Sequence, residues 1–522
     1  MKREDSIQAL EDASTVWDVL VIGGGATGLS TAVDAAARGY RTALVEQDDF
    51  AKGTSSRSTK LIHGGFRYLK QGNVSLVMES LHERGLLLRN APHLVKPLSF
   101  VVPAYRWWEA PYYMAGLKLY DALAGRLGIA PSDLLSRDET IEQIPTIEPH
   151  RLNGGVQYFD GQFDDSRLAI CLAQTLTDLG GAPANYVRVE SFLKTNGRIA
   201  GVVARDLETD KEVSLRAKVT INATGIFTDQ VRQMDEAEAS GMMMTSQGVH
   251  IVLDRSFLPG DSAIMIPKTD DGRILFAIPW QGRTVIGTTD TPLPKPALEP
   301  RALPDEIEFL VEHAARYLTK DPTDSDVLSV YAGLRPLVKA GDGQDTSKLS
   351  RNHRIVVSDS GLVTITGGKW TTCRKMGEDT IDRAAKVGGL QPRPEATREL
   401  KLHGAAGAED QDANWPGYGS DAGGLEDLIR KKPEWNERLH PNLPVRAAEV
   451  VWAVRHEMAR DLEDILSRRT RALLLDTKAS VEIAPAVAEI AAKELKQKAA
   501  WRKAQVHSFR QLARNYTIGR VA

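Results

Sequence analysis

The sequence predicts an α/β protein that combines a three-layer domain on a parallel sheet, an antiparallel sheet interleaved with that domain, and an all-helical C-terminal domain. Three patterns indicate this fold. Residues 18–46 contain a buried apolar run, a glycine turn, a helical stretch and a second apolar run. Residues 248–290 contain short apolar runs separated by turn residues, which is typical of antiparallel strands. Residues 445–515 carry apolar side chains at helical spacing.

The first pattern is typical of a Rossmann-like dinucleotide-binding unit. Gly23, Gly25 and Gly28 have the G-x-G-x-x-G spacing between an apolar strand and a helix. Gly23 allows a tight turn, Gly25 lets the backbone approach a pyrophosphate, and Gly28 lets the helix pack closely on the strand. The first amides of the helix face the phosphates. Glu46 ends the second strand, where a carboxylate accepts hydrogen bonds from an adenosine ribose.

Two later segments are expected to return to the same sheet. An apolar strand at residues 217–222 ends in the small residues Ala223 and Gly225, where the backbone can also approach a nucleotide. A strand at 362–366 leads into Gly368, Lys369 and a further helix. The expected organisation is a flexible tail (1–15), the nucleotide domain (16–390) with its interleaved second domain (about 95–150 and 240–348), a linker (391–420) and the helical domain (421–522).

The composition excludes several classes of protein. A net charge of −3 gives no indication of a nucleic-acid partner. Cys171 and Cys373 are the two cysteines, and neither a C-x-x-C nor an H-E-x-x-H pattern indicates a metal site. The N-terminus lacks the apolar core of a secretory signal, and no apolar run is long enough to cross a membrane. We therefore expect a cytoplasmic protein.

Two further segments have an unusual composition. Residues 105–120 are rich in aromatic side chains beside Arg106 and Lys118. Such a segment lies in a lipid interface or packs on the core or on another subunit, and packing is slightly favoured. The basic run at 468–471 is interpreted as a solvated or ion-paired face rather than a binding site.

Several motifs, in order along the chain, resemble those of FAD-dependent glycerol-3-phosphate dehydrogenases. They lie at residues 54–69, 221–225, 278–280, 286–290, 333–337, 367–369, 454–458 and 468–472. The resemblance implies that the three-layer domain binds FAD and that the antiparallel sheet binds substrate. It also implies oxidation of sn-glycerol 3-phosphate to dihydroxyacetone phosphate, with electrons passed to a membrane quinone or, in the oxidase branch, to oxygen. Quinone use places the protein on the inner face of the cytoplasmic membrane.

The resemblance also assigns cofactor contacts to the loop after the first βαβ unit. Ser55, Ser56 and Lys60 are expected at the pyrophosphate or the flavin ring, and His63 and Gly64 at the flavin. From the other end of the domain, the helix after Gly368 is placed to stabilise negative charge on the flavin, and Lys369 to reach flavin or substrate. Lys369 facing solvent is the alternative interpretation.

Substrate recognition requires a cation for the phosphate and a base for the hydroxyl proton. Arginine binds phosphate with two parallel hydrogen bonds, and Arg335 follows a strand at a Gly-x-Arg-Pro turn. The resemblance implies that Arg335 contacts substrate and that Arg351 is the second contact; a structural ion pair and a surface turn are the respective alternatives. His250 is the candidate base, because histidine titrates near neutrality, or else a core histidine.

The remaining assignments are less specific. Arg57 and Tyr68 are expected to face the substrate. Two alternative functions stay open: a glycerol-3-phosphate oxidase that uses oxygen, and a flavin-binding regulatory protein without turnover. The sequence leaves open the membrane-docking surface, a homodimer, covalent attachment of FAD and the identity of the catalytic base.

Overall fold

The computed structural model describes residues 1–522 except 66–67, 70–71, 271, 340–352, 407–413 and 519–522. Among the described residues, the first sheet has the strand order β17-β18-β10-β1-β2-β7, and a β8–β9 hairpin extends from β10. Strands β18, β10, β1, β2 and β7 run parallel, as expected for a dinucleotide-binding sheet. The strands are β1 (Val16–Ile22), β2 (Thr42–Val45), β7 (Ala182–Ala184), β8 (Val187–Thr195), β9 (Arg198–Asp206), β10 (Lys211–Asn222), β17 (Arg354–Val357) and β18 (Val363–Thr366).

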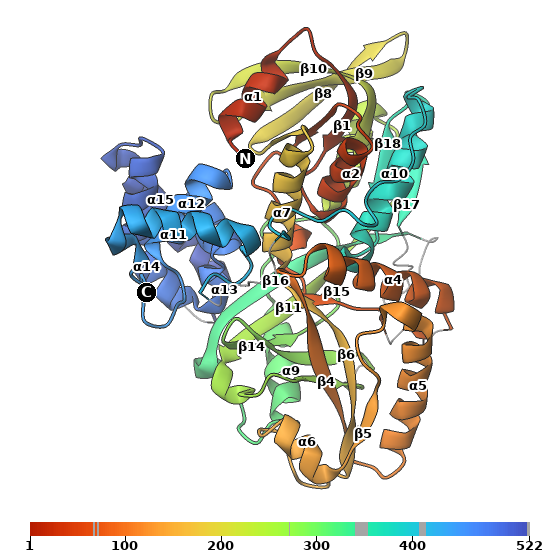
Figure 1. Ribbon diagram of the computed structural model, residues 1–522, viewed down its shortest axis with the longest axis vertical. Helices are drawn as coiled ribbons and strands as arrows, with labels where there is room; N and C mark the ends of the chain where they lie inside the picture. Colours follow the sequence, from red (N-terminus) through yellow and green to blue (C-terminus); the bar gives the residue numbers. More distant parts are fainter. Residues whose placement is uncertain (66–67, 70–71, 271, 340–352, 407–413, 519–522) are drawn as a thin grey trace.

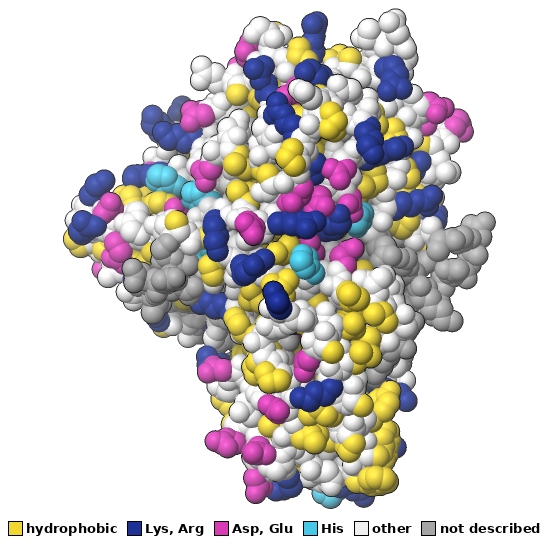
Figure 2. All heavy atoms as spheres, turned by 45° about the vertical axis from the view of Figure 1, so that its right-hand side comes forward, with side chains coloured by type: hydrophobic (Ala, Val, Ile, Leu, Met, Phe, Trp, Pro, Cys, Tyr) yellow, Lys and Arg dark blue, Asp and Glu magenta, His cyan; other side chains and the backbone are white. Residues whose placement is uncertain are grey.

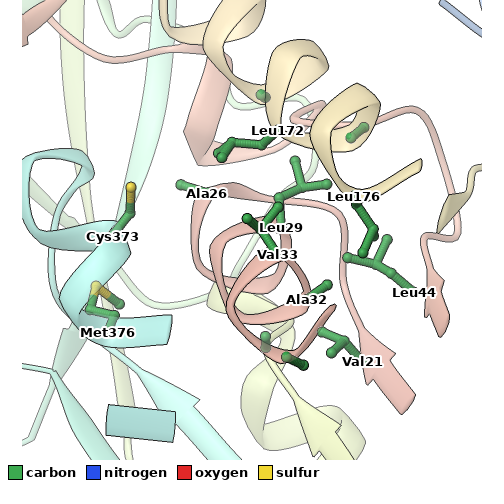
Figure 3. Packing of buried hydrophobic residues seen from close by; sticks show 14 of the residues in the cluster. Val21, Ala26, Leu29, Ala32, Val33, Leu44, Leu172, Leu176, Cys373 and Met376 are labelled. Carbon is green, nitrogen blue, oxygen red and sulfur yellow. The ribbon is translucent and has the colours of Figure 1, made fainter. Parts of the chain in front are cut away.

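Both faces of this sheet are covered, which makes the domain three-layered. Helices α2 (Ala26–Ala37), α7 (Asp165–Asp178) and α10 (Cys373–Val387) pack together on one face (Figure 1). In Figure 3, α2 lies between α7 and α10, and its Leu29 belongs to the same apolar cluster as Leu172 of α7 and Cys373 of α10, so this layer is one apolar core. The β8–β9 hairpin, α1 (Arg3–Glu11) and α8 (Thr228–Asp235) cover the other face.

Helix α1 corrects the expectation of a flexible tail at residues 1–15. Leu10 packs with Trp17 in the apolar cluster on that face of the sheet. Arg3 is buried and pairs with Asp206 at 2.5 Å. The segment is mostly polar, so its composition does not predict that one apolar edge of the helix packs on the sheet.

The second sheet has the order β15-β11-β14-β13-β12-β4-β6-β3, with β16 on β11 and β5 on β6 among the described residues. Its pairings are antiparallel except for β12 with β4. The strands are β3 (Leu61–Ile62), β4 (Val95–Ala104), β5 (Asp133–Leu135), β6 (Gly154–Phe163), β11 (Met243–Asp254), β12 (Ala263–Ile266), β13 (Leu275–Trp280), β14 (Arg283–Gly287), β15 (Thr291–Leu293) and β16 (Val327–Val338). The accompanying helices are α4 (Val74–Asn90), α5 (Glu109–Ala124), α6 (Arg137–Gln143) and α9 (Pro304–Ala315).

Helices make up the C-terminal region, which lies beside both sheets (Figure 1). Its apolar core is continuous with that of the second sheet, because Leu473 and Leu474 cluster with Val252 and Tyr331. The segment before it, 391–420, has no α-helix or strand in its described part, but Leu402 is buried against the first domain. The helices are α11 (Ala422–Lys431), α12 (Ala447–His456), a π-helix (Asp464–Arg469), α13 (Ala472–Leu475), α14 (Thr477–Glu494) and α15 (Ala499–Ala513).

Candidate active site

A cavity of about 550 Å³ runs from the carboxyl ends of β1 and β2 to the second sheet. Its walls include the glycine turn, the loop after β2, the turn after β10 and the turn after β18. The second sheet contributes Gly248, His250, Gly333 and Arg335. A cleft outside the carboxyl ends of parallel strands is where open α/β sheets bind ligands.

The glycine turn has the geometry that its sequence predicts. Gly23 has φ +110°, and a Cβ there would lie 2.6 Å from the carbonyl oxygen of Ala223. A Cβ on Gly28 would lie 1.9 Å from the carbonyl oxygen of Gly23, so helix and strand can pack this closely only at glycine. Gly25 caps α2 and lines the cavity, whereas Gly28 lies behind the wall. The positive end of α2 thus faces a space that suits a pyrophosphate.

Glu46 lines the same end of the cavity. Its carboxylate accepts hydrogen bonds from the amides of Gly24, at 2.6 Å, and Asp48, at 2.9 Å. Burial raises the pKa of Glu46 to about 7, although these two bonds favour the charged form. The carboxylate is therefore fixed in position beside the glycine turn.

The expected cofactor contacts in the loop after β2 divide into two groups. Ser55 and His63 line the cavity, and the Ser55 hydroxyl accepts a hydrogen bond from the amide of Ala26 at 2.9 Å. Ser56, Lys60 and Gly64 are absent from its walls. At the other end of the domain, Ala223, Gly225, Gly368 and Lys369 line the cavity, as their positions after β10 and β18 predict.

Lys60 and Gly64 lie outside the cavity for different physical reasons. The Lys60 ammonium is buried and lies 2.7 Å from a carboxylate oxygen of Asp165, a partner 105 residues away. The amide of Gly64 donates to the Tyr120 hydroxyl at 2.7 Å. Both residues are therefore bonded to partners that lie behind the cavity wall.

His250 lies in the wall on β11. Its Nε2 is 2.9 Å from Oγ1 of Thr59, and its ring stacks on Tyr331 with centroids 4.7 Å apart. Burial, together with the positive charges of Lys60 and Arg335, holds the pKa of His250 well below its usual value. The imidazole is therefore neutral near pH 7.

Arg335 lines the cavity from β16, and its guanidinium is held by residues 288–290, which follow β14. Nη1 lies 3.2 Å from Oδ1 of Asp290, and Nη2 donates to Oγ1 of Thr288 and to the carbonyl of Thr289. The ion pair named as an alternative for Arg335 is therefore present, and it leaves the side chain at the cavity wall. Thr59 and Asp290 were not selected from the sequence, although Asp290 ends one of the recognised motifs.

The less specific substrate contacts are not supported by side-chain positions. Arg57 lines the cavity, but its guanidinium is engaged by the protein itself: it lies 2.5 Å from a Glu299 oxygen and over the ring of Tyr516. Tyr68 is buried, and its ring centroid is 5.2 Å from the Lys369 ammonium; it is absent from the cavity walls. Arg351 lies outside the described residues.

Comparison with known proteins agrees with this geometry. Residues 18–374 match the family "FAD dependent oxidoreductase", and residues 395–505 match the "C-terminal domain of alpha-glycerophosphate oxidase". The mitochondrial glycerol-3-phosphate dehydrogenase of Macaca fascicularis is 41% identical over 94% of this chain and 72% of its own length. That of Arabidopsis thaliana is 40% identical over 94% of this chain and 85% of its own. The chain belongs to the FAD-dependent glycerol-3-phosphate dehydrogenase family.

A solved structure extends the agreement to the whole fold. The glycerol-3-phosphate dehydrogenase of Bacillus halodurans, in complex with FAD, superposes with a TM-score of 0.80 at 30% identity, covering 100% of this chain and 99% of that one. The cofactor of the family, FAD, fits the residues present here. The glycine cradle, the N-terminus of α2 and Glu46 suit its dinucleotide half, and Lys369 and His250 line the same cavity.

Proposed function

We propose that the protein oxidises sn-glycerol 3-phosphate to dihydroxyacetone phosphate and passes the electrons to a membrane quinone. One observation carries this proposal: a single cavity joins the dinucleotide cradle to a neutral histidine and an arginine on the second sheet. A small phosphorylated alcohol requires these two groups, a proton acceptor and a phosphate-binding cation, next to the cofactor.

FAD, when bound, supplies the hydride acceptor for the C2 hydrogen of the substrate. His250 accepts the proton of the C2 hydroxyl, and its stacking on Tyr331 and contact with Thr59 fix the plane of the imidazole. Arg335 binds the phosphate, and Asp290 orients the guanidinium for that contact. Lys369 places a positive charge at the cavity wall where negative charge develops.

The test is the visible spectrum of the purified holoenzyme under anaerobic conditions. We expect sn-glycerol 3-phosphate to bleach the flavin absorbance, and glycerol, which lacks the phosphate, to leave it unchanged at the same concentration. A colourless protein, or a yellow one whose spectrum does not respond to the phosphorylated alcohol, would contradict the proposal.

The electron acceptor needs a separate experiment, because the C-terminal match is to a domain named from an oxidase. Steady-state turnover with a quinone analogue under nitrogen is compared with peroxide production in air. The proposal requires quinone reduction to be the faster reaction. Peroxide production at an equal or higher rate would assign the protein to oxygen instead.

Quinone reduction also requires contact with a membrane, and we propose that α5 and the residues before it dock on the inner face of the cytoplasmic membrane. Trp107 is 83% exposed, Tyr112 55% and Leu119 49%. Figure 2 shows hydrophobic side chains gathered on the lower part of the face that includes this region. Exposed aromatic side chains of this density suit a lipid interface. No helix in the described parts of the chain has the length and apolar character to cross a bilayer.

A further inference from the structure

Three buried charged side chains lie directly behind the cavity loop, and the mechanism above gives none of them a contact with the substrate. Asp165, at the start of α7, is fully buried between Lys60 and Arg471. One carboxylate oxygen lies 2.7 Å from the Lys60 ammonium, and the other lies 3.0 Å from Nη2 of Arg471. Although burial opposes it, these two cations lower the pKa of Asp165. Buried charges are costly unless each is paired, so the three side chains form one unit.

This unit binds the backbone of the loop that lines the cavity. Asp165 accepts hydrogen bonds from the amide and the hydroxyl of Ser58, at 3.0 and 2.7 Å. The carbonyl of Ser56 accepts from both Lys60, at 3.0 Å, and Arg471, at 2.9 Å. Ser56 and Ser58, which flank Arg57, are therefore held by hydrogen bonds on the side of the loop that faces away from the cavity.

The opposite side of the same loop forms the cavity wall. Ser58 and Thr59 line the cavity, and the Thr59 hydroxyl contacts His250 at 2.9 Å. The ring of Tyr331, which stacks on His250, also donates a hydrogen bond through its hydroxyl to the carbonyl of Ser58, at 3.1 Å. A shift of Ser58 thus moves both supports of His250.

Arg471 brings the C-terminal helical region into this arrangement. It precedes α13, and its guanidinium bridges Ser467 of its own segment to Ser56 and Asp165 of the first domain. A planar guanidinium can reach several acceptors at fixed angles, whereas a lysine ammonium is a single point charge. The side chain is therefore suited to set a position as well as to neutralise a carboxylate.

We propose that Arg471 is a positioning residue for the reaction: by holding Ser56 and Asp165, it sets the loop at 54–60 and thereby the Thr59–His250 contact. This inference rests on the proposed role of His250. The basic run at 468–471 is expected from the sequence to form a solvated or ion-paired face; its last residue, Arg471, then contributes to catalysis through a loop that it contacts from outside the cavity.

A second buried ion pair across the same interface provides a matched control. Arg167, two residues beyond Asp165 on α7, pairs with Glu457 of the C-terminal region at 2.7 Å, and both are buried. Within the described part of the chain, neither side chain forms a hydrogen bond with residues 54–60. Glu457→Gln therefore weakens the interface without releasing the loop.

The test compares the holoenzymes of the wild type, Arg471→Lys, Arg471→Met and Glu457→Gln. Hydrogen–deuterium exchange of the segment 53–60 and the visible circular dichroism of bound FAD report the loop directly. Steady-state kinetics with sn-glycerol 3-phosphate separates kcat from KM. Arg471→Lys keeps the charge and is the deciding variant if Arg471→Met does not fold.

We expect Arg471→Lys to speed hydrogen–deuterium exchange at residues 53–60 and to alter the visible circular dichroism of bound FAD. It should also lower kcat about tenfold or more and change KM by less than about twofold, because a displaced catalytic group affects the chemical step. Glu457→Gln should lower the melting temperature and leave these readouts unchanged. Equal behaviour of the two variants, or unchanged exchange in Arg471→Lys, would overturn the inference. If the wild-type flavin does not respond to the substrate, the proposed function fails, while exchange and dichroism still decide whether Arg471 sets the loop.

Discussion

Nε2 of His250 and Oγ1 of Thr59 lie 2.9 Å apart, although 191 residues separate them in the chain. His250 belongs to the second sheet, and Thr59 to the loop that leaves the dinucleotide unit. Their contact joins the two domains at the cavity wall and fixes the imidazole there. The proposed chemistry depends on this junction, since neither domain alone provides both the cofactor cradle and the base.

Replacing His250 with asparagine should slow flavin reduction by sn-glycerol 3-phosphate by about 10²- to 10⁴-fold, the usual contribution of a general base. FAD content should stay at the wild-type level, because the glycine cradle is untouched. Anaerobic stopped-flow absorbance measures the first quantity, and the ratio of flavin to protein absorbance measures the second. Reduction at the wild-type rate would remove His250 from the mechanism.

The wild-type reaction should also lack an acid limb near pH 6.5. Burial, Lys60 and Arg335 hold the pKa of His250 well below its usual value, so the imidazole stays unprotonated as the pH falls from 8 through about 6. The pH profile of kcat/KM for flavin reduction measures this. A decline with a midpoint near the ordinary histidine pKa would show that the base titrates as if it were exposed.

Arg335→Ala should lower kcat/KM for sn-glycerol 3-phosphate, mainly by raising KM. The loss of transition-state stabilisation should be about 2 kcal/mol or more, which is the value of a hydrogen bond to a charged group. Binding of FAD should not change. Arg335→Lys should recover part of the loss, because it keeps the charge without the planar fork. Arg255→Ala removes an exposed arginine of the same sheet region, paired with Asp261, and serves as the control. Equal kinetics in Arg335→Ala and Arg255→Ala would remove the phosphate assignment.

These sites differ in how far the sequence predicts them. The glycine cradle follows from local spacing, because each glycine acts within a few residues of the turn. For Arg335 the sequence predicts either a substrate contact or an ion pair, and in the structure Arg335 both lines the cavity and pairs with Asp290. The partner of Lys60, by contrast, is 105 residues away, so nothing near Lys60 in the chain indicates that its ammonium is buried.

Distant partners also explain why the sequence does not predict the packing of the N-terminal helix or the burial of the basic run at 468–471. Arg3 pairs with Asp206, and Arg469 with Asp49, over separations that no motif spans. A charged side chain is predicted to be solvated unless its partner is known. Sequence patterns therefore predict the sheets and the cradle, whereas the buried charges that join the domains emerge only from the folded chain.

The folded protein should become less stable at alkaline pH, because the His403 imidazolium loses its proton there. Its Nε2 lies 3.2 Å from Asp421 and its Nδ1 lies 2.7 Å from Asp178, so one imidazolium joins α7 to the start of the helical region. Hydrogen bonds to Asp421, and then to Asp178, raise the pKa of His403 to about 9, although burial opposes them. Because the folded pKa is the higher one, the stabilisation is complete below about 6.5 and is lost as the pH rises through about 9.

The melting temperature measured from pH 6 to 9.5 tests this dependence. His403→Gln should remove about 1 kcal/mol at pH 6, after allowance for solvent screening, and should make little difference at pH 9.5. The difference between variant and wild type should therefore shrink as the pH rises. A constant difference across this range would contradict the assignment.

Docking on lipid should depend on the aromatic residues at and before α5. Replacing both Trp107 and Tyr112 with serine removes two exposed rings, so co-sedimentation with liposomes should fall about tenfold or more if each buried ring contributes of the order of 1 kcal/mol. Turnover with a water-soluble electron acceptor should be unchanged, because these side chains do not line the cavity. Turnover with a quinone embedded in the same liposomes should fall together with binding.

Leu207→Ser provides the matched control, since Leu207 is also exposed but lies at the turn between β9 and β10, on the first sheet. The control should bind liposomes as the wild type does, because its position is remote from α5. Equal loss in the control and in the double variant would indicate general adsorption of apolar side chains. Full liposome binding by the double variant would place the docking surface elsewhere on the protein, while leaving the assignments of His250 and Arg335 intact.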